Sequence, residues 1–211
     1  TRTTAVGADP ARIAVMGESA GGGLAAALAL LARDRGAYKI AFQHLIYPML
    51  DDRTCVAQSP NPVAGEFIWT RHNNHFGWSA LLGHAPGAEG VSPYAAPARA
   101  TDLAGLPPTF IACPTLDLFI DEDIDYAARL ARAGVPVELI VYRGGFHGFD
   151  IFGGDAPIGL EGHERVGIAV NEDDRLLEPA ERGPDGRQLC GLGSHLADRV
   201  SEVAGQHGLE K

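Results

Sequence analysis

A serine between two glycines is the residue of this sequence best suited to chemistry. The segment 17–21 reads Gly-Glu-Ser-Ala-Gly, the pattern G-x-S-x-G, with a short apolar run before it and an alanine-rich stretch after it. A sharp turn from strand to helix projects such a serine hydroxyl out of the backbone, where a base can take its proton. The N–H of the next residue then lies at a helix N-terminus and can donate to an oxyanion. We therefore predict Ser19 as a nucleophile and Ala20 as an oxyanion donor.

A serine nucleophile needs a histidine base, and His147 is the best of eight candidates. It lies in the segment Gly-Gly-Phe-His-Gly-Phe at 144–149, directly after an apolar run predicted to be a strand. The glycines on both sides let the backbone bend so that the ring can reach across a sheet edge. His44 lies within a predicted strand and is expected to be structural. The remaining histidines, which we interpret as surface or hydrogen-bonded groups or which carry no motif, are His72, His75, His84, His163, His195 and His207.

An acid must orient the histidine, and several carboxylates follow the predicted strand at 108–113. Asp117 is preferred because it comes soonest after the strand. Asp121 and Glu122 are better placed as first-turn acids of the following helix, where the helix dipole favours negative charge. The sequence therefore predicts Asp117 as the orienting acid, with Asp121 and Glu122 as the alternatives.

Alternating short apolar runs and amphipathic stretches indicate an α/β fold with a mostly parallel sheet flanked by helices. The carboxyl ends of parallel strands share one edge, so the serine, acid and histidine should converge there. The predicted strands are 12–16, 40–47, 108–113 and 137–142, the predicted helices are 24–33, 66–83 and 121–133, and the segments 51–65 and 85–107 are predicted loops.

Composition excludes several classes of function. The chain has 211 residues and a net charge of −10 with no compensating basic cluster, which argues against a nucleic-acid or anionic-membrane partner. No apolar run approaches the roughly 18–20 residues of a membrane span. The three cysteines are odd in number and widely spaced, which fits a reducing compartment best, and we expect a cytoplasmic location. No metal-binding spacing, P-loop or dinucleotide loop is present.

The sequence resembles a known family, the bacterial hormone-sensitive-lipase-like esterases, which are α/β hydrolases. The resemblance spans residues 5–152 and is carried by GADPARIAVMGESAGGGLAAALAL, LIYPMLDDR, FIWTRHNNHFGWSALLG, SPYAAPARATDLAGLPPTFI, LDLFIDEDIDYAARLARAGVPVEL and YRGGFHGF. The family element D-x-L-x-D-E begins at Asp117 and ends at Glu122.

The resemblance implies a carboxylic ester hydrolase that uses short to medium acyl esters, without a metal or organic cofactor. It implies Ser19 as nucleophile, His147 as general base and acid, Asp117 as orienter and the Ala20 N–H as an oxyanion donor. It also mildly favours a homodimer. Apolar side chains that flank these residues are expected to line the substrate site or to belong to the core, namely Leu118, Phe119, Phe146 and Phe149.

Two segments depart from the family pattern. Only 18 residues precede Ser19, so we expect a hydrolase core without the family's N-terminal strands, H-G-G-G oxyanion loop and cap. After residue 153 glycines and acids dominate, and only 195–206 has a helical pattern. We therefore predict residues 1–152 as part of a catalytic domain and 153–211 as an atypical tail.

Two alternatives to an esterase stay open from sequence. The same three residues could serve a lactonase or an amidase. The missing oxyanion loop instead favours a non-catalytic protein that binds a ligand or a partner, because losing even one oxyanion donor costs about 10²- to 10³-fold in rate.

Overall fold

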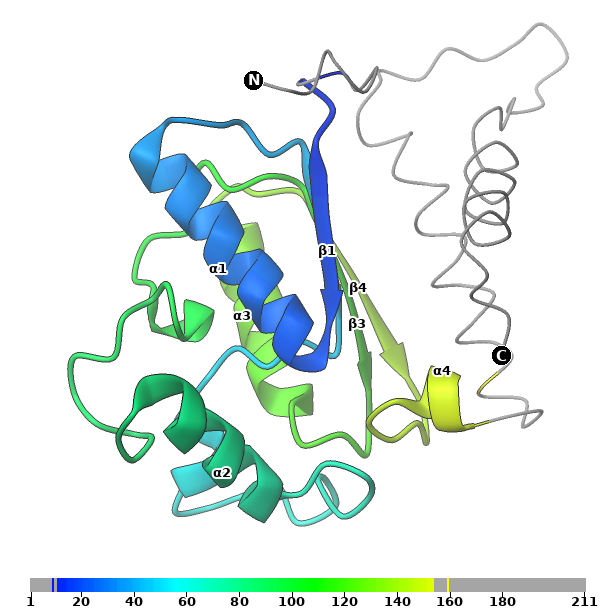
Figure 1. The fold of residues 1–211 in the computed structure, drawn as a ribbon. Coiled ribbons are helices and arrows are strands. Elements are labelled where there is room, and N and C mark those ends of the chain that lie inside the picture. Colours follow the sequence, from blue (N-terminus) through cyan, green and yellow to red (C-terminus); the bar gives the residue numbers. More distant parts are fainter. Residues whose placement is uncertain (1–8, 10, 154–158, 160–211) are drawn as a thin grey trace, which may run out of the picture. The chain divides into compact units, whose positions relative to one another are not determined.

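The fold is a four-stranded parallel sheet in which the strands follow one another in chain order (Figure 1). The computed structural model describes residue 9, residues 11–153 and residue 159. The strands are β1 (Ala14–Glu18), β2 (Phe42–Ile46), β3 (Thr109–Pro114) and β4 (Val137–Tyr142). All four lie within two residues of their predicted bounds, which confirms the α/β-hydrolase class of sheet.

Two long helices cover the same face of this sheet (Figure 1). They are α1 (Ser19–Arg35) and α3 (Ile120–Arg132), each of which connects a strand to a later parallel strand. Parallel crossovers are right-handed, so strands added in one direction place their helices on one face. The core between these helices and the sheet is built from small and branched side chains, including Ala26, Leu30, Leu45, Ile111 and Leu130.

The helix predicted over 66–83 is shorter than expected. Helix α2 spans Arg71–Leu82, and the Thr70 hydroxyl accepts a hydrogen bond from the Asn73 N–H at its start. The preceding Ile68 has φ 59°, which a helix cannot include. The prediction was therefore wrong for the first five residues, where an aromatic run imitates a helical apolar face. Conversely, α1 begins at Ser19, five residues before its predicted start.

The predicted loops contain two short 3₁₀ turns, Thr54–Val56 and Pro97–Arg99. A four-residue helix, α4 (Phe149–Phe152), follows β4. The helix predicted over 195–206 lies outside the described residues, and the boundary predicted at residue 152 stays a prediction. No helix in the described part of the chain has the length and apolar character needed to cross a bilayer.

Candidate active site

Ser19 stands on a strained turn between β1 and α1. Its φ is 54°, a left-handed value that costs energy for a residue with a side chain and that aims its hydroxyl away from the sheet. The turn is tight because Gly17 and Gly21 approach each other: a Cβ on Gly17 would lie 2.2 Å from the Gly21 oxygen. Glycine is therefore required at position 17, as the G-x-S-x-G pattern indicates.

His147 contacts both Ser19 and Asp117, the two residues predicted to act with it. Its Nδ1 lies 2.7 Å from Asp117 Oδ2, and its Nε2 lies 2.9 Å from Ser19 Oγ. A carboxylate only accepts hydrogen bonds, so Nδ1 carries the proton and Nε2 accepts from the serine hydroxyl. Three segments that are up to 128 residues apart thus form one chain of hydrogen bonds.

Asp117 is held in place from two sides. Its Oδ2 faces His147, and its Oδ1 accepts a hydrogen bond from the Phe119 N–H at 3.1 Å. The side chain is fully buried, so the carboxylate cannot turn toward water without breaking both contacts. Asp121, one of the two alternatives, is exposed on the first turn of α3.

Glu122, the other alternative, has a structural position that sequence reasoning missed. It is buried, and its Oε1 accepts from the N–H groups of Leu50 and Asp51, at 2.6 and 3.1 Å, while Oε2 accepts from the Thr54 hydroxyl. Burial raises the pKa of Glu122 despite these hydrogen bonds. The carboxyl group therefore ties the start of α3 to the loop after β2, rather than to His147.

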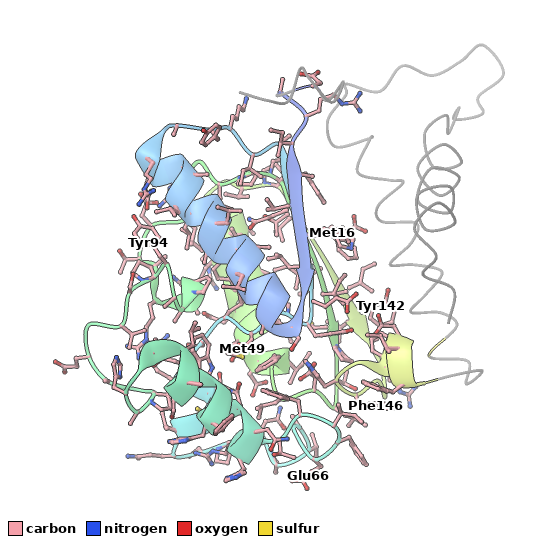
Figure 2. All side chains as sticks on the ribbon, in the orientation of Figure 1. Met16, Met49, Glu66, Tyr94, Tyr142 and Phe146 are labelled. Atoms are coloured by element: carbon pink, nitrogen blue, oxygen red, sulfur yellow. The ribbon has the colours of Figure 1, made fainter. Side chains whose placement is uncertain are left out.

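Aromatic rings surround the His147 imidazole. The Tyr47 ring lies 4.8 Å away, the Phe119 ring 5.3 Å away and edge-on, and the Trp69 ring 6.2 Å away. Figure 2 shows Phe146 beside α4, at the edge of the sheet where β4 ends. Its ring is 6.2 Å from that of Phe67, which is about half exposed. At this edge of the sheet, apolar side chains therefore surround the hydrogen-bonded side chains of Ser19, His147 and Asp117.

Of the four apolar side chains expected to line the substrate site or to belong to the core, Leu118, Phe119 and Phe149 are buried and Phe146 is partly buried. Phe119 packs against His147, and Phe149 packs against the rings of Tyr47 and Tyr142. Leu118 lies beneath Gly65. Their contact with a substrate stays a prediction.

Ala20 is the second residue of α1. The first four N–H groups of a helix have no partner within the helix, so the Ala20 N–H is free of the helical ladder beside the Ser19 hydroxyl. Its role as an oxyanion donor stays a prediction.

The other described histidines lie away from this chain of hydrogen bonds. His44 is buried in β2 and stacks on Phe110, with 4.6 Å between the ring centroids. His72, His75 and His84 are exposed. Among the described residues, no cluster of three or more histidine, cysteine or acidic side chains has an arrangement that could hold a metal ion.

Comparison with known proteins assigns the family. A family model described as the alpha/beta hydrolase fold matches residues 1–151. The chain belongs to the hormone-sensitive-lipase-like α/β hydrolases. It is 37% identical over 169 residues to esterase LipI of Mycobacterium tuberculosis, covering 78% of this chain and 51% of that protein. The resemblance predicted from sequence is therefore confirmed.

Solved structures of esterases share the fold of this hydrolase. A bacterial heroin esterase superposes with a TM-score of 0.74 at 42% identity, over 84% of this chain and 56% of that one. Esterase LipW from Mycobacterium marinum gives a TM-score of 0.69 at 35% identity, over 82% of this chain and 53% of that one. The chain spans about half the length of the relatives that it matches.

Proposed function

We propose that this α/β hydrolase cleaves carboxylic esters through an acyl-enzyme on Ser19. The observation that carries the proposal is the continuous chain from Ser19 Oγ through both nitrogens of His147 to Asp117, with heavy-atom distances of 2.9 and 2.7 Å. These are the contacts that a nucleophile, its base and an orienting acid require. The esterases among its relatives support the same chemistry.

In the acylation step, Ser19 Oγ attacks the ester carbonyl carbon while its proton moves to His147 Nε2. Asp117 accepts the Nδ1 hydrogen bond, which fixes the ring's tautomer and stabilises the imidazolium that forms. The Ala20 N–H donates to the carbonyl oxygen as negative charge develops on it. Nε2 then returns the proton to the alkoxy leaving group, and the acyl group remains on Ser19.

Deacylation repeats these proton movements with water. His147 Nε2 takes a proton from a water molecule, whose oxygen attacks the acyl carbon, and the proton then returns to Ser19 Oγ. The carboxylic acid leaves and the free serine is restored. Short to medium acyl chains fit the apolar side chains around His147, among which Leu118, Phe119 and Phe149 are the proposed lining.

The direct test is hydrolysis of p-nitrophenyl butyrate by the parent chain and by Ser19→Ala and Asp117→Asn. We expect Ser19→Ala to abolish turnover above background, and Asp117→Asn to lower kcat by roughly 10³- to 10⁴-fold through the wrong histidine tautomer. Ser92→Ala, outside the site, serves as the control. Equal rates in the parent and Ser19→Ala proteins would overturn the proposal and favour a non-catalytic protein.

A further inference from the structure

A second hydrogen bond lies behind the His147 ring and takes no part in the proton transfers described above. The Tyr47 hydroxyl donates to Asp150 Oδ1 at 2.8 Å, and both side chains are buried. The two residues are 103 positions apart in sequence. Tyr47 directly follows β2, whereas Asp150 belongs to α4, three residues after His147. The bond therefore joins the turn that carries the histidine, which follows β4, to the end of β2, on the other side of β3 in the sheet.

The backbone of Tyr47 is also fixed. Its φ is 34°, an uncommon value for a residue with a bulky side chain, and its N–H donates to the Ala112 oxygen in β3. Such a conformation persists where the surroundings over-determine it. The ring thereby lies 4.8 Å from the His147 ring at an interplanar angle of 60°. On another side, the Phe119 ring meets the imidazole edge-on at 83°.

The protonation of the Tyr47 phenol favours its hydrogen bond to Asp150. Burial, with the Asp150 carboxylate beside it, raises the pKa of Tyr47, so the phenol stays protonated as a donor. A hydrogen bond from a hydroxyl to a carboxylate is shorter and stronger than one between two neutral groups. Removing either partner would leave a buried polar group unsatisfied.

We propose that Tyr47 and Asp150 are positioning residues for the His147 imidazole. Asp150 holds the phenol, the phenol ring fixes the plane of the imidazole, and Asp117 fixes its rotation within that plane. The proposal rests on the proposed esterase function, because its consequence for rate is a histidine that points its Nε2 at Ser19. Neither residue touches the reacting atoms.

The test compares kcat and KM for p-nitrophenyl butyrate in Tyr47→Phe, Asp150→Ala, Asp150→Asn and the Tyr47→Phe/Asp150→Ala double variant. We expect each of the first two to lower kcat about 10- to 100-fold with little change in KM, as a small misplacement of a catalytic group does. Asp150→Asn keeps an acceptor for the phenol and should restore most of the rate lost in Asp150→Ala. The double variant should be no slower than Asp150→Ala, because both changes remove the same bond.

Tyr126→Phe provides the matched control. Tyr126 is also a fully buried tyrosine, but it lies in the core between α1 and α3, and its hydroxyl has no partner among the described residues. We expect this variant to keep the parent kcat. Wild-type kcat in folded Tyr47→Phe and Asp150→Ala, or additive losses in the double variant, would overturn the proposal.

A second readout does not depend on turnover. The His147 Nδ1 proton, held by Asp117, should give a downfield NMR signal that is identified by its loss in His147→Gln. We expect this signal to shift or broaden in Tyr47→Phe and Asp150→Ala, and to be retained in Asp150→Asn and Tyr126→Phe. An unchanged signal in all four variants would refute the positioning role, whereas a changed signal in a protein without esterase activity would refute only the proposed function.

Discussion

At the scale of single residues, Asp123 carries a buried carboxyl group that no hydrogen bond stabilises within the described structure. Its side chain is fully buried on α3, and neither carboxyl oxygen has a hydrogen-bond partner within the described structure. Burial, with the Glu122 and Asp117 carboxylates nearby, raises the pKa of Asp123 well above its usual range. The protonated form is therefore the one that the folded state prefers.

This raised pKa makes stability depend on pH in a predictable direction. In the unfolded chain Asp123 ionises near pH 4, whereas in the folded protein it keeps its proton to higher pH. The unfolded state thus binds fewer protons over this window, and the free energy of unfolding falls as pH rises through it. The loss is about 1.4 kcal/mol for each unit by which the folded pKa exceeds the unfolded one.

Asp123→Asn should remove this loss, because an amide does not ionise. We expect the unfolding free energy of the variant, relative to the parent, to increase as the pH is raised from 5 to 8 in urea titrations. Asp121→Asn, two residues away and exposed, should show a constant difference over the same range. A constant difference for Asp123→Asn as well would show that the buried carboxyl group is not the source.

Sequence reasoning reached Ser19, His147 and Asp117 because each carries a local signal, a motif or a position just after a strand. It did not reach Tyr47 and Asp150, although the end of the strand predicted at 40–47 already placed Tyr47 at the carboxyl edge. The hydrogen bond between them joins residues that are 103 positions apart in sequence, and no local pattern predicts such a contact.

At the scale of elements, the N-terminus of α1 meets the backbone that follows β2 with no room for a side chain. A Cβ on Gly23 would lie 2.1 Å from the Met49 oxygen, and one on Gly22 would lie 2.8 Å from the Pro48 Cβ. The Met49 N–H also donates to the Ser19 oxygen at 2.9 Å. Gly22 and Gly23 are therefore needed for the close packing of α1 against the segment that follows β2.

Gly23→Ala and Gly21→Ala separate packing from helix propensity. Gly23→Ala must displace backbone, and we expect it to lower the free energy of unfolding by about 1–3 kcal/mol or more. Gly21 has nothing within 4 Å of an added Cβ, so Gly21→Ala should be neutral or stabilise by up to about 1 kcal/mol. Thermal and urea unfolding of both variants measure these changes in the free energy of unfolding. Equal changes in the two variants would contradict the close contact between Gly23 and the Met49 backbone.

The sequence predicts some helix and strand bounds well and others poorly. All four strands were predictable because each is a short apolar run bounded by turn residues. The start of α2 was not, because Phe67, Ile68 and Trp69 continue the apolar spacing while Ile68 takes a left-handed conformation. Thr70 was the available signal, since threonine is a favoured N-cap residue.

At the scale of the whole molecule, a buried ion pair holds the long connection between α2 and β3 to the rest of the fold. Arg99 donates to Asp52 from Nε and Nη2 at 2.7 and 2.8 Å, and the Gly87 N–H donates to the same carboxylate at 2.7 Å. Burial opposes the ionisation of Asp52, but the Arg99 and Gly87 hydrogen bonds outweigh it and lower the pKa. The associated stability is present above about pH 4 and is lost as the pH falls through the folded pKa.

Arg99→Met should leave the Asp52 charge buried without its cation. We expect a loss of about 3 kcal/mol in the free energy of unfolding at pH 7, because breaking one side of a buried pair exposes its full desolvation cost. Arg53→Met removes a cation from a comparable pair with Asp51, but the Arg53 side chain is half exposed, so its loss should stay below about 1 kcal/mol. Similar losses in the two variants would contradict the anchoring role of Arg99.

Phosphylation of Ser19 tests the central claim most directly. Diethyl p-nitrophenyl phosphate reacts with a serine whose hydroxyl is activated by a histidine, and the adduct can be located by peptide mass spectrometry. We predict one diethylphosphoryl group on the peptide that contains Ser19 in the parent chain, and none on that peptide in His147→Ala or Ser19→Ala. An unmodified Ser19 in the folded parent, or equal labelling of the parent and His147→Ala, would contradict the claim that His147 activates Ser19.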